Sequence, residues 1–170
     1  MELPKRKHTR LPAYDYSQHG AYFVTICTKD RKRLFAVDVG RGLAPAECPE
    51  DEMLTPMGAV AKEELLALTK RFPCLRIDKY VIMPNHIHAI LLIDETAAGA
   101  SPRPTLSDIV CAYKSLTART CKLRFRYAAD IWQTGFYDHV IRNEPDYLRV
   151  WEYIDENTSR WSEDEYYREE

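Results

Sequence analysis

The chain has 170 residues, of which 45% are hydrophobic and 29% are charged, and its formal net charge at pH 7 is −2. These values are typical of a soluble globular protein, and the length suits a single domain spanning 1–170. No apolar run approaches the ~18 residues that a membrane span needs, and the N-terminus has no apolar signal-peptide core. We therefore expect a cytoplasmic protein with no membrane partner.

The first elements predicted from the sequence are a strand and a helix. Residues 1–20 show little periodicity and are expected to form an N-terminal arm. Residues 21–28 are β-branched and aromatic, which predicts a strand. From Thr55 to Phe72 the apolar residues follow helical spacing, which predicts a helix.

A hairpin and a second helix follow. Two runs rich in branched apolar residues, 75–83 and 86–93, predict strands, and Pro84 marks the tight turn between them. Thr105 can then cap a helix, because apolar residues recur on one side of the segment after it.

The last third of the chain predicts a strand, a helix and a tail. A fourth strand is expected within residues 131–141 and a final helix over 147–157, while the acidic tail, 162–170, is expected to be poorly ordered. The resulting order β-α-β-β-α-β-α predicts an α+β, ferredoxin-like fold. Its antiparallel sheet would carry helices on one face, with an additional C-terminal helix.

His86 and His88 are the most informative pair of residues in the chain. Side chains two positions apart on a strand point to the same face, so both imidazoles should project side by side from a buried sheet. Polar rings are costly to bury without partners, and a metal ion would bind both. The alternative is that both histidines are structural.

Tyr153 and Asn157 lie four residues apart in the predicted final helix and therefore share a face. Tyrosine offers a phenolate nucleophile, and asparagine offers an oxygen that can bind a hard cation. Two imidazoles and one amide oxygen leave positions for water and a phosphate oxygen, which suits Mg²⁺ or Mn²⁺ better than a closed zinc site. The alternative is that Tyr153 belongs to the core and Asn157 caps the helix.

Five stretches of the chain, in the right order, resemble the REP-associated tyrosine transposases, a group of single-tyrosine HUH transposases. They are residues 10–16 (RLPAYDY), 20–28 (GAYFVTICT), 81–88 (VIMPNHIH), 132–133 (WQ) with 136–143 (FYDHVIRN), and 153–157 (YIDEN) with Trp161. Together they extend over nearly the whole chain, so the resemblance concerns the entire domain. The chain departs from the family pattern at Thr158, where the family has proline.

The resemblance implies an enzyme that nicks and rejoins single-stranded DNA through a covalent 5′-phosphotyrosine. His86 and His88 would be the metal ligands, Asn157 the third ligand and Tyr153 the nucleophile. Mg²⁺ or Mn²⁺ is the implied cofactor. The implied partner is single-stranded DNA that contains a hairpin-forming or palindromic repeat.

Basic residues are grouped along the sequence, with nine Lys or Arg against four Asp or Glu in residues 1–42. Such groups suit single-stranded DNA, because Lys and Arg contact phosphates while bases stack on aromatic rings. The candidates for DNA contact are Lys5, Arg6, Lys7, Arg10, Tyr14, Tyr16, Arg119, Lys122, Arg124 and Arg126. Candidates for supporting roles at the site are Asp138, His139 and Arg142.

Two other functions are compatible with the sequence. One is a non-catalytic single-stranded nucleic-acid-binding protein with structural histidines, and the other is a metal-dependent phosphodiesterase that uses water. The oligomeric state is also open: a monomer, or a homodimer whose subunits exchange the helix carrying Tyr153.

Overall fold

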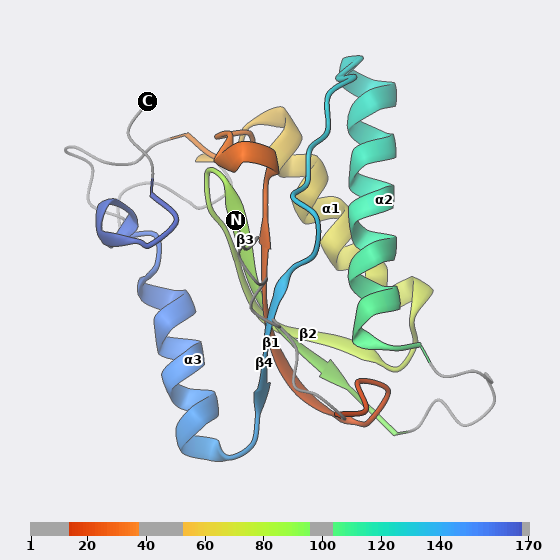
Figure 1. Ribbon diagram of the computed structural model, residues 1–170, viewed down its shortest axis with the longest axis vertical. Coiled ribbons are helices and arrows are strands. Elements are labelled where there is room, and N and C mark those ends of the chain that lie inside the picture. Colours follow the sequence, from red (N-terminus) through yellow and green to blue (C-terminus); the bar gives the residue numbers. More distant parts are fainter. Residues whose placement is uncertain (1–13, 38–52, 96–103, 168–170) are drawn as a thin grey trace, which may run out of the picture.

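The computed structural model describes residues 14–37, 53–95 and 104–167, which form a four-stranded antiparallel sheet with helices on both faces (Figure 1). The strands are β1 (Gly20–Cys27), β2 (Leu75–Ile82), β3 (His86–Ile93) and β4 (Tyr137–Ile141), and the helices are α1 (Pro56–Arg71), α2 (Leu106–Phe125) and α3 (Glu144–Glu156). The strand order β2-β3-β1-β4 confirms the predicted α+β, ferredoxin-like arrangement. No helix among the described residues combines the length and apolar character that a membrane span requires.

The three helices begin where local side-chain chemistry favours a helix start. Thr55, Thr105 and Asn143 each accept a hydrogen bond from a backbone N–H in the first turn of the helix that follows. The last helix begins at Glu144, with Pro145 in its first turn, as expected for a helix that the segment Glu144-Pro145-Asp146 opens.

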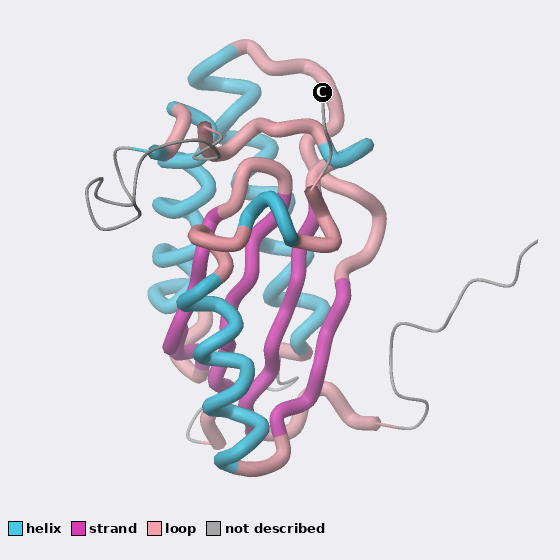
Figure 2. The backbone as a smooth tube through the Cα atoms, turned by 90° about the vertical axis from the view of Figure 1, so that its left-hand side faces the viewer, coloured by secondary structure: helices cyan, strands magenta, loops and turns pink. Residues whose placement is uncertain are grey.

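The alternating side chains of β1 and β3 face two separate cores. On one face, Tyr22 and Ala89 pack beneath α1 and α2 in the main core. On the other face, Phe23 and Ile90 pack with Ile154 of α3 in a smaller core, and α3 lies over the sheet, roughly along the strands (Figure 2). The strand period of two therefore turns His86 and His88, which have the parity of Ile90, toward α3.

Contacts with both edge strands hold α3 on the sheet. Nε2 of His139 in β4 lies 2.8 Å from a carboxylate oxygen of Asp146 in the first turn of α3. Near the other end of α3, Lys79 of β2 forms an ion pair with Asp155. Because Ile154 is also buried in the smaller core, α3 is fixed along its length, and with it the position of Tyr153.

The prediction of a poorly ordered acidic tail over 162–170 is wrong for residues 162–167. After α3 the chain forms a short 3-10 helix, Trp161–Glu163, and turns back toward the sheet. Trp161 is 2% exposed in the smaller core, and the backbone N–H of Tyr167 donates to the carbonyl oxygen of Asp164 at 2.9 Å. Burial of one large aromatic side chain overrides the disorder that the acidic composition suggested.

Gly58 allows the first turn of α1 to contact the segment that precedes it. A Cβ atom at this position would lie 1.8 Å from the carbonyl oxygen of Phe35. The backbone N–H groups of Leu34 and Phe35 in turn donate to the carbonyl oxygen of Pro84, at 2.8 and 3.1 Å. This close contact therefore supports the turn that leads into His86.

Replacing Gly58 with alanine is expected to lower the free energy of unfolding by about 2 kcal/mol, as measured by chemical denaturation. The added carbon forces a backbone shift that outweighs a gain of about 1 kcal/mol in helix propensity. The matched control is Ala59→Gly, at an exposed position of the same turn, which should cost about 1 kcal/mol through propensity alone. A Gly58→Ala protein as stable as the parent would contradict the close contact with Phe35.

Candidate functional site

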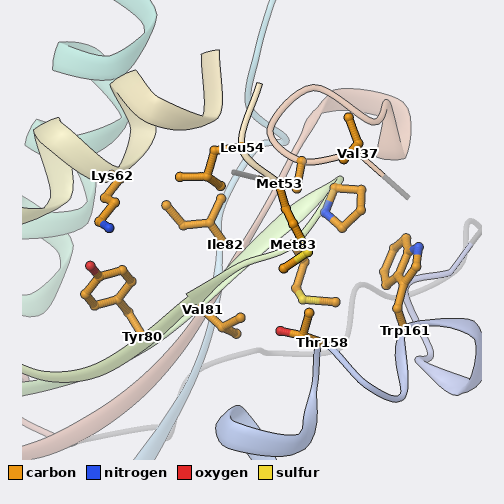
Figure 3. A pocket seen from close by; sticks show the side chains of 12 residues that line it. Val37, Met53, Leu54, Lys62, Tyr80, Val81, Ile82, Met83, Thr158 and Trp161 are labelled. Atoms are coloured by element: carbon orange, nitrogen blue, oxygen red, sulfur yellow. The ribbon is translucent and has the colours of Figure 1, made fainter. Parts of the chain in front are cut away.

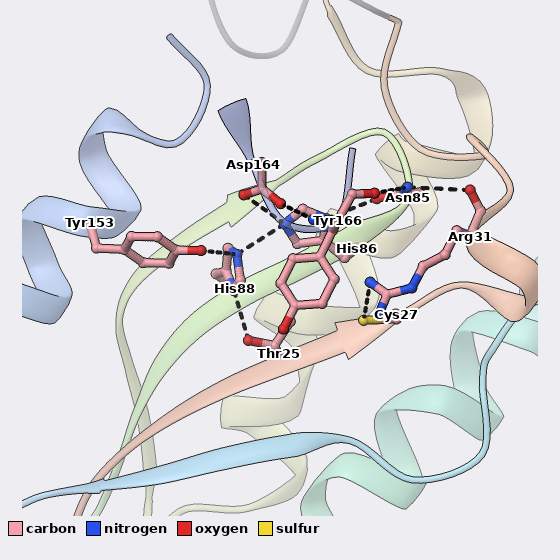
Figure 4. Close-up of polar contacts among 9 residues, drawn as sticks. All are labelled: Thr25, Cys27, Arg31, Asn85, His86, His88, Tyr153, Asp164 and Tyr166. Carbon is pink, nitrogen blue, oxygen red and sulfur yellow. Dashed lines mark hydrogen bonds and ion pairs between the residues drawn. The ribbon is translucent and has the colours of Figure 1, made fainter. Parts of the chain in front are cut away.

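The structure places the two predicted histidines side by side on β3, with both rings buried (Figure 4). Their Nε2 atoms are 2.9 Å apart and their ring centroids are 4.4 Å apart. The antiparallel register sets Cys27 of β1 opposite His86 and Thr25 opposite His88. The two imidazoles therefore converge on one point above the centre of the sheet.

Each histidine ring is oriented through its Nδ1 atom. Asn85 donates through Nδ2 to the carbonyl oxygen of Tyr166 at 2.9 Å, which leaves its Oδ1 2.9 Å from Nδ1 of His86. An amide oxygen only accepts, so Nδ1 of His86 donates and its Nε2 keeps a lone pair. Nδ1 of His88 lies 2.9 Å from Oγ1 of Thr25, a hydroxyl that can accept in the same way. Both Nε2 atoms can therefore bind a cation.

Burial keeps both imidazoles neutral. It lowers the pKa of His88 to about 3. Burial, followed by the charges of His88 and Arg31, lowers the pKa of His86 well below its ordinary value of 6.5. Two neutral rings whose lone pairs face one another repel unless a proton or a cation lies between them. Since neutral imidazole is the form that binds metals, the pair suits a divalent cation.

Asp164 adds a carboxylate to the histidine pair, and sequence reasoning missed it. Its Oδ2 lies 4.0 Å from Nε2 of His86, and potential ligand atoms of His86, His88 and Asp164 all lie within 4.8 Å of one another. Burial raises the pKa of Asp164, while hydrogen bonds from the Tyr166 backbone and the Asn157 side chain lower it. Two imidazole nitrogens and a carboxylate oxygen could hold a metal ion.

Asn157 lies beside this group with an unsatisfied oxygen. It occupies the C-cap position of α3, as the structural alternative predicted, and it also lines the cleft next to His88. Its Oδ1 is buried and has no hydrogen-bond partner among the described residues. A buried carbonyl oxygen without a partner costs free energy, which a cation ligand would recover. The free Oδ1 of Asn157 therefore fits the ligand role predicted for this residue.

Tyr153 points from α3 toward the histidines (Figure 4). Its Oη lies 3.3 Å from Nε2 of His88, and its ring packs edge-on against Phe23. Burial and the charge of Asp164 raise the pKa of Tyr153 to about 12, opposed by a hydrogen bond from Asn157. The phenol is therefore protonated at neutral pH, and a nearby positive charge would favour its ionisation.

An open cleft of about 910 Å³ connects Tyr153 and His88 with solvent. Side chains of the sheet, including Phe23, Thr25 and Tyr137, form its floor. Residues of α3 and of the segment after Trp161 form its walls. A polymer strand can therefore approach Tyr153 and His88 from one side.

A second cavity lies between the β2–β3 hairpin and the segment that leads into α1 (Figure 3). It holds about 30 Å³ and is lined mainly by apolar side chains, among them Met53, Leu54, Val81 and Met83. Its described lining includes no histidine, cysteine, aspartate or glutamate. The cleft beside Tyr153 is therefore the candidate active site, and the apolar cavity is a packing gap.

The three supporting candidates lie on or just after β4. Nε2 of His139 and the backbone N–H of Arg142 both bind the carboxylate of Asp146, at 2.8 and 3.4 Å, and so help to position α3. Asp138 is buried opposite Val24, on the face turned toward α1 and α2. The structure thus connects His139 and Arg142 with the helix that carries Tyr153.

The N-terminal DNA-contact candidates divide into two groups. Tyr14 and Tyr16 pack edge-to-face with each other at 5.0 Å, and both contact Tyr22 beside the main core. Outside the described residues lie Lys5, Arg6, Lys7 and Arg10.

The candidates of α2 lie near its C-terminal end. Arg119 and Lys122 line an open groove of about 400 Å³. Arg124 forms an ion pair with Glu63 of α1 at 2.8 Å, and Arg126 ends α2 in the left-handed conformation. Arg119 and Lys122 are therefore the members of this group that line a hollow in the surface.

Known proteins are similar to this chain in sequence and in fold. No protein-family model matches the sequence. An uncharacterised protein of Haemophilus influenzae is 31% identical over 95% of this chain and 93% of its own length, and the two belong to one family. The REP-associated tyrosine transposase of Escherichia coli K12 is 23% identical over 82% of this chain and 66% of its own length. In sequence, the chain therefore resembles a REP-associated tyrosine transposase over most of its length.

The fold is also similar to that of a solved protein. A solved REP-associated tyrosine transposase bound to a REP hairpin matches with a TM-score of 0.60 and 21% identity, over 89% of this chain and 74% of that one. The resemblance predicted from the five stretches is therefore confirmed.

Replacing His88 with alanine is expected to weaken Mn²⁺ binding at least about tenfold, because one of two converging imidazoles is lost. Isothermal titration of the full chain with Mn²⁺ measures the change, and Asp164→Ala tests the carboxylate in the same titration. The control is His19→Ala, since His19 is exposed and pairs with Glu95. Unchanged Mn²⁺ affinity in His88→Ala would contradict the assignment.

Proposed function

We propose that this protein nicks single-stranded DNA and rejoins it through a covalent bond to Tyr153. The observation that carries the proposal is the 3.3 Å distance between Oη of Tyr153 and Nε2 of His88, which joins a nucleophile to a cation-binding pair. The relationship to REP-associated tyrosine transposases supports a transposase or DNA-processing function for the same residues.

Mg²⁺ or Mn²⁺ fits the donor set of the site. Nε2 of His86, Nε2 of His88 and the carboxylate of Asp164 would hold the ion, and the unpartnered Oδ1 of Asn157 is available as a fourth donor. When bound, the ion would polarise the scissile phosphate and offset the negative charge that develops on its oxygens. Mixed nitrogen and oxygen donors in an open cleft suit such an ion better than a closed structural zinc site.

Tyr153 supplies the nucleophile for the nicking step. Its Oη attacks phosphorus, an O–P bond forms, and the bond from phosphorus to the 3′ oxygen of the upstream nucleotide breaks. The phenol gives up its proton as it attacks, and the departing oxygen gains one and becomes a 3′-OH. The product is a 5′-phosphotyrosine on Tyr153 and a free 3′ end.

The covalent intermediate accounts for strand transfer without a nucleotide cofactor. The bond between phosphorus and Tyr153 replaces a phosphodiester bond of similar free energy. A second 3′-OH can therefore attack the same phosphorus and release Tyr153. Asp146 and His139 contribute indirectly, since their contact holds α3 against β4 while the strand is exchanged.

The proposed substrate is a hairpin-forming single strand. The solved relative was bound to a REP hairpin, and the cleft beside Tyr153 is open enough to admit an extended strand. Arg119 and Lys122, in the groove at the end of α2, could contact further phosphates of the same DNA.

Tyr153→Phe is expected to reduce formation of the covalent protein–DNA adduct at least about 10³-fold, because the attacking oxygen is removed. A denaturing gel of the full chain incubated with hairpin DNA and Mn²⁺ measures the adduct. The matched control is Tyr147→Phe. It removes another hydroxyl of α3, which donates to Asp78 of β2, and should leave the adduct intact.

The same gel separates the proposal from its alternatives. Cleavage by Tyr153→Phe at the parental rate would favour a phosphodiesterase that uses water. Binding of hairpin DNA with neither cleavage nor adduct, with or without Mn²⁺, would favour a non-catalytic binding protein.

A further inference from the structure

Aromatic rings extend the floor of the cleft beyond Tyr153. The Phe23 ring of β1 stacks on His88 with centroids 5.2 Å apart and meets Tyr153 edge-on at 6.0 Å. Toward the edge of the sheet, Phe23 also meets Tyr137 of β4 edge-on at 6.5 Å. A contiguous series of rings therefore leads from the histidine pair to the edge strand.

Tyr137 is the exposed end of this aromatic floor. Its side chain is 47% exposed, whereas Phe23 is 8% exposed. The strand register sets Tyr137 opposite Thr25, and Thr25 opposite His88, so the three residues form one row across the sheet. Two strand spacings separate Tyr137 from His88, which is about 10 Å.

The charges around the cleft favour a neutral group on this floor. Arg149 and Arg160, the two cations of the lining, already form ion pairs with Asp146 at 2.6 Å and Glu156 at 3.0 Å. The lining includes five carboxylates, those of Glu152, Glu156, Glu163, Asp164 and Glu165. Phosphates that followed these walls would be repelled, whereas an uncharged nucleobase would not.

We propose that Tyr137 is a stacking platform for an unpaired nucleobase next to the scissile phosphate. The inference rests on the proposed function, in which Tyr153 attacks that phosphate beside the histidine pair. A nucleotide adjacent to the phosphate can reach across about 10 Å to the Tyr137 ring. Every base has a π face, so Tyr137 would fix the position of the strand without selecting a base.

The test uses the full chain with Mn²⁺ and a hairpin oligonucleotide that has single-stranded flanks. One base of the flanks at a time is replaced by 2-aminopurine, whose fluorescence falls when it stacks on a ring. The parent is expected to quench most strongly at one position beside the mapped cleavage site. Tyr137→Ala and Tyr137→Leu should abolish that quenching and raise the dissociation constant about tenfold, while Tyr137→Phe keeps both values.

Trp151→Ala is the matched control. Trp151 is an exposed ring of α3 that lies outside the cleft lining and contacts Lys79 at 3.9 Å, so its removal should leave quenching and affinity unchanged. Parental quenching in Tyr137→Ala, or its loss in Tyr137→Phe, would overturn the stacking role.

The two proposals fail separately in this experiment, because quenching needs no cleavage. Tyr137-dependent quenching without a Tyr153 adduct would support the platform and count against the proposed chemistry. A Tyr153 adduct without Tyr137-dependent quenching would support the chemistry and overturn the platform.

Discussion

The site depends on one constraint: two neutral imidazoles converge on the buried face of the sheet. Nε2 of His86 and Nε2 of His88 lie 2.9 Å apart, and Asn85 and Thr25 hold the opposite ring nitrogens. Burial disfavours protonation of either ring, so their facing lone pairs need a cation. The strand geometry that aligns these rings also sets Tyr137 and Thr25 in the row beside them.

The remaining groups reach the histidines from the C-terminal part of the chain. Asp146 joins α3 to His139 of β4, which fixes the helix that presents Tyr153. Burial of Trp161 then folds the following segment back, so that Asp164 reaches the same point above the sheet. The smaller core between α3 and the sheet therefore does more than stabilise the fold, because it brings the candidate ligands to the histidine pair.

Local patterns predicted the parts of the site that lie within single elements. Strand alternation put His86 and His88 on one face, and helical spacing put Tyr153 and Asn157 on one face. Asp164 could not be predicted in this way, because its approach to His86 joins residues 78 positions apart. Its acidic neighbours are typical of a solvated tail, and only the tertiary burial of Trp161 reverses that expectation.

Tyr137 illustrates the same division between local and tertiary information. Its place in a strand was predicted, yet its position in one row with Thr25 and His88 depends on a register between strands that lie far apart in the sequence. The motif that contains Tyr137 also contains His139, whose contact with Asp146 shows one structural role for that stretch.

The central claim is that His86, His88 and Asp164 hold a divalent cation within reach of Tyr153. Anomalous X-ray diffraction from crystals of the full chain grown with Mn²⁺ tests it most directly. The predicted result is an anomalous peak within coordination distance of Nε2 of His86, Nε2 of His88 and the carboxylate of Asp164. A structure with Mn²⁺ bound elsewhere, and with the two Nε2 atoms still in direct contact with each other, would contradict the claim.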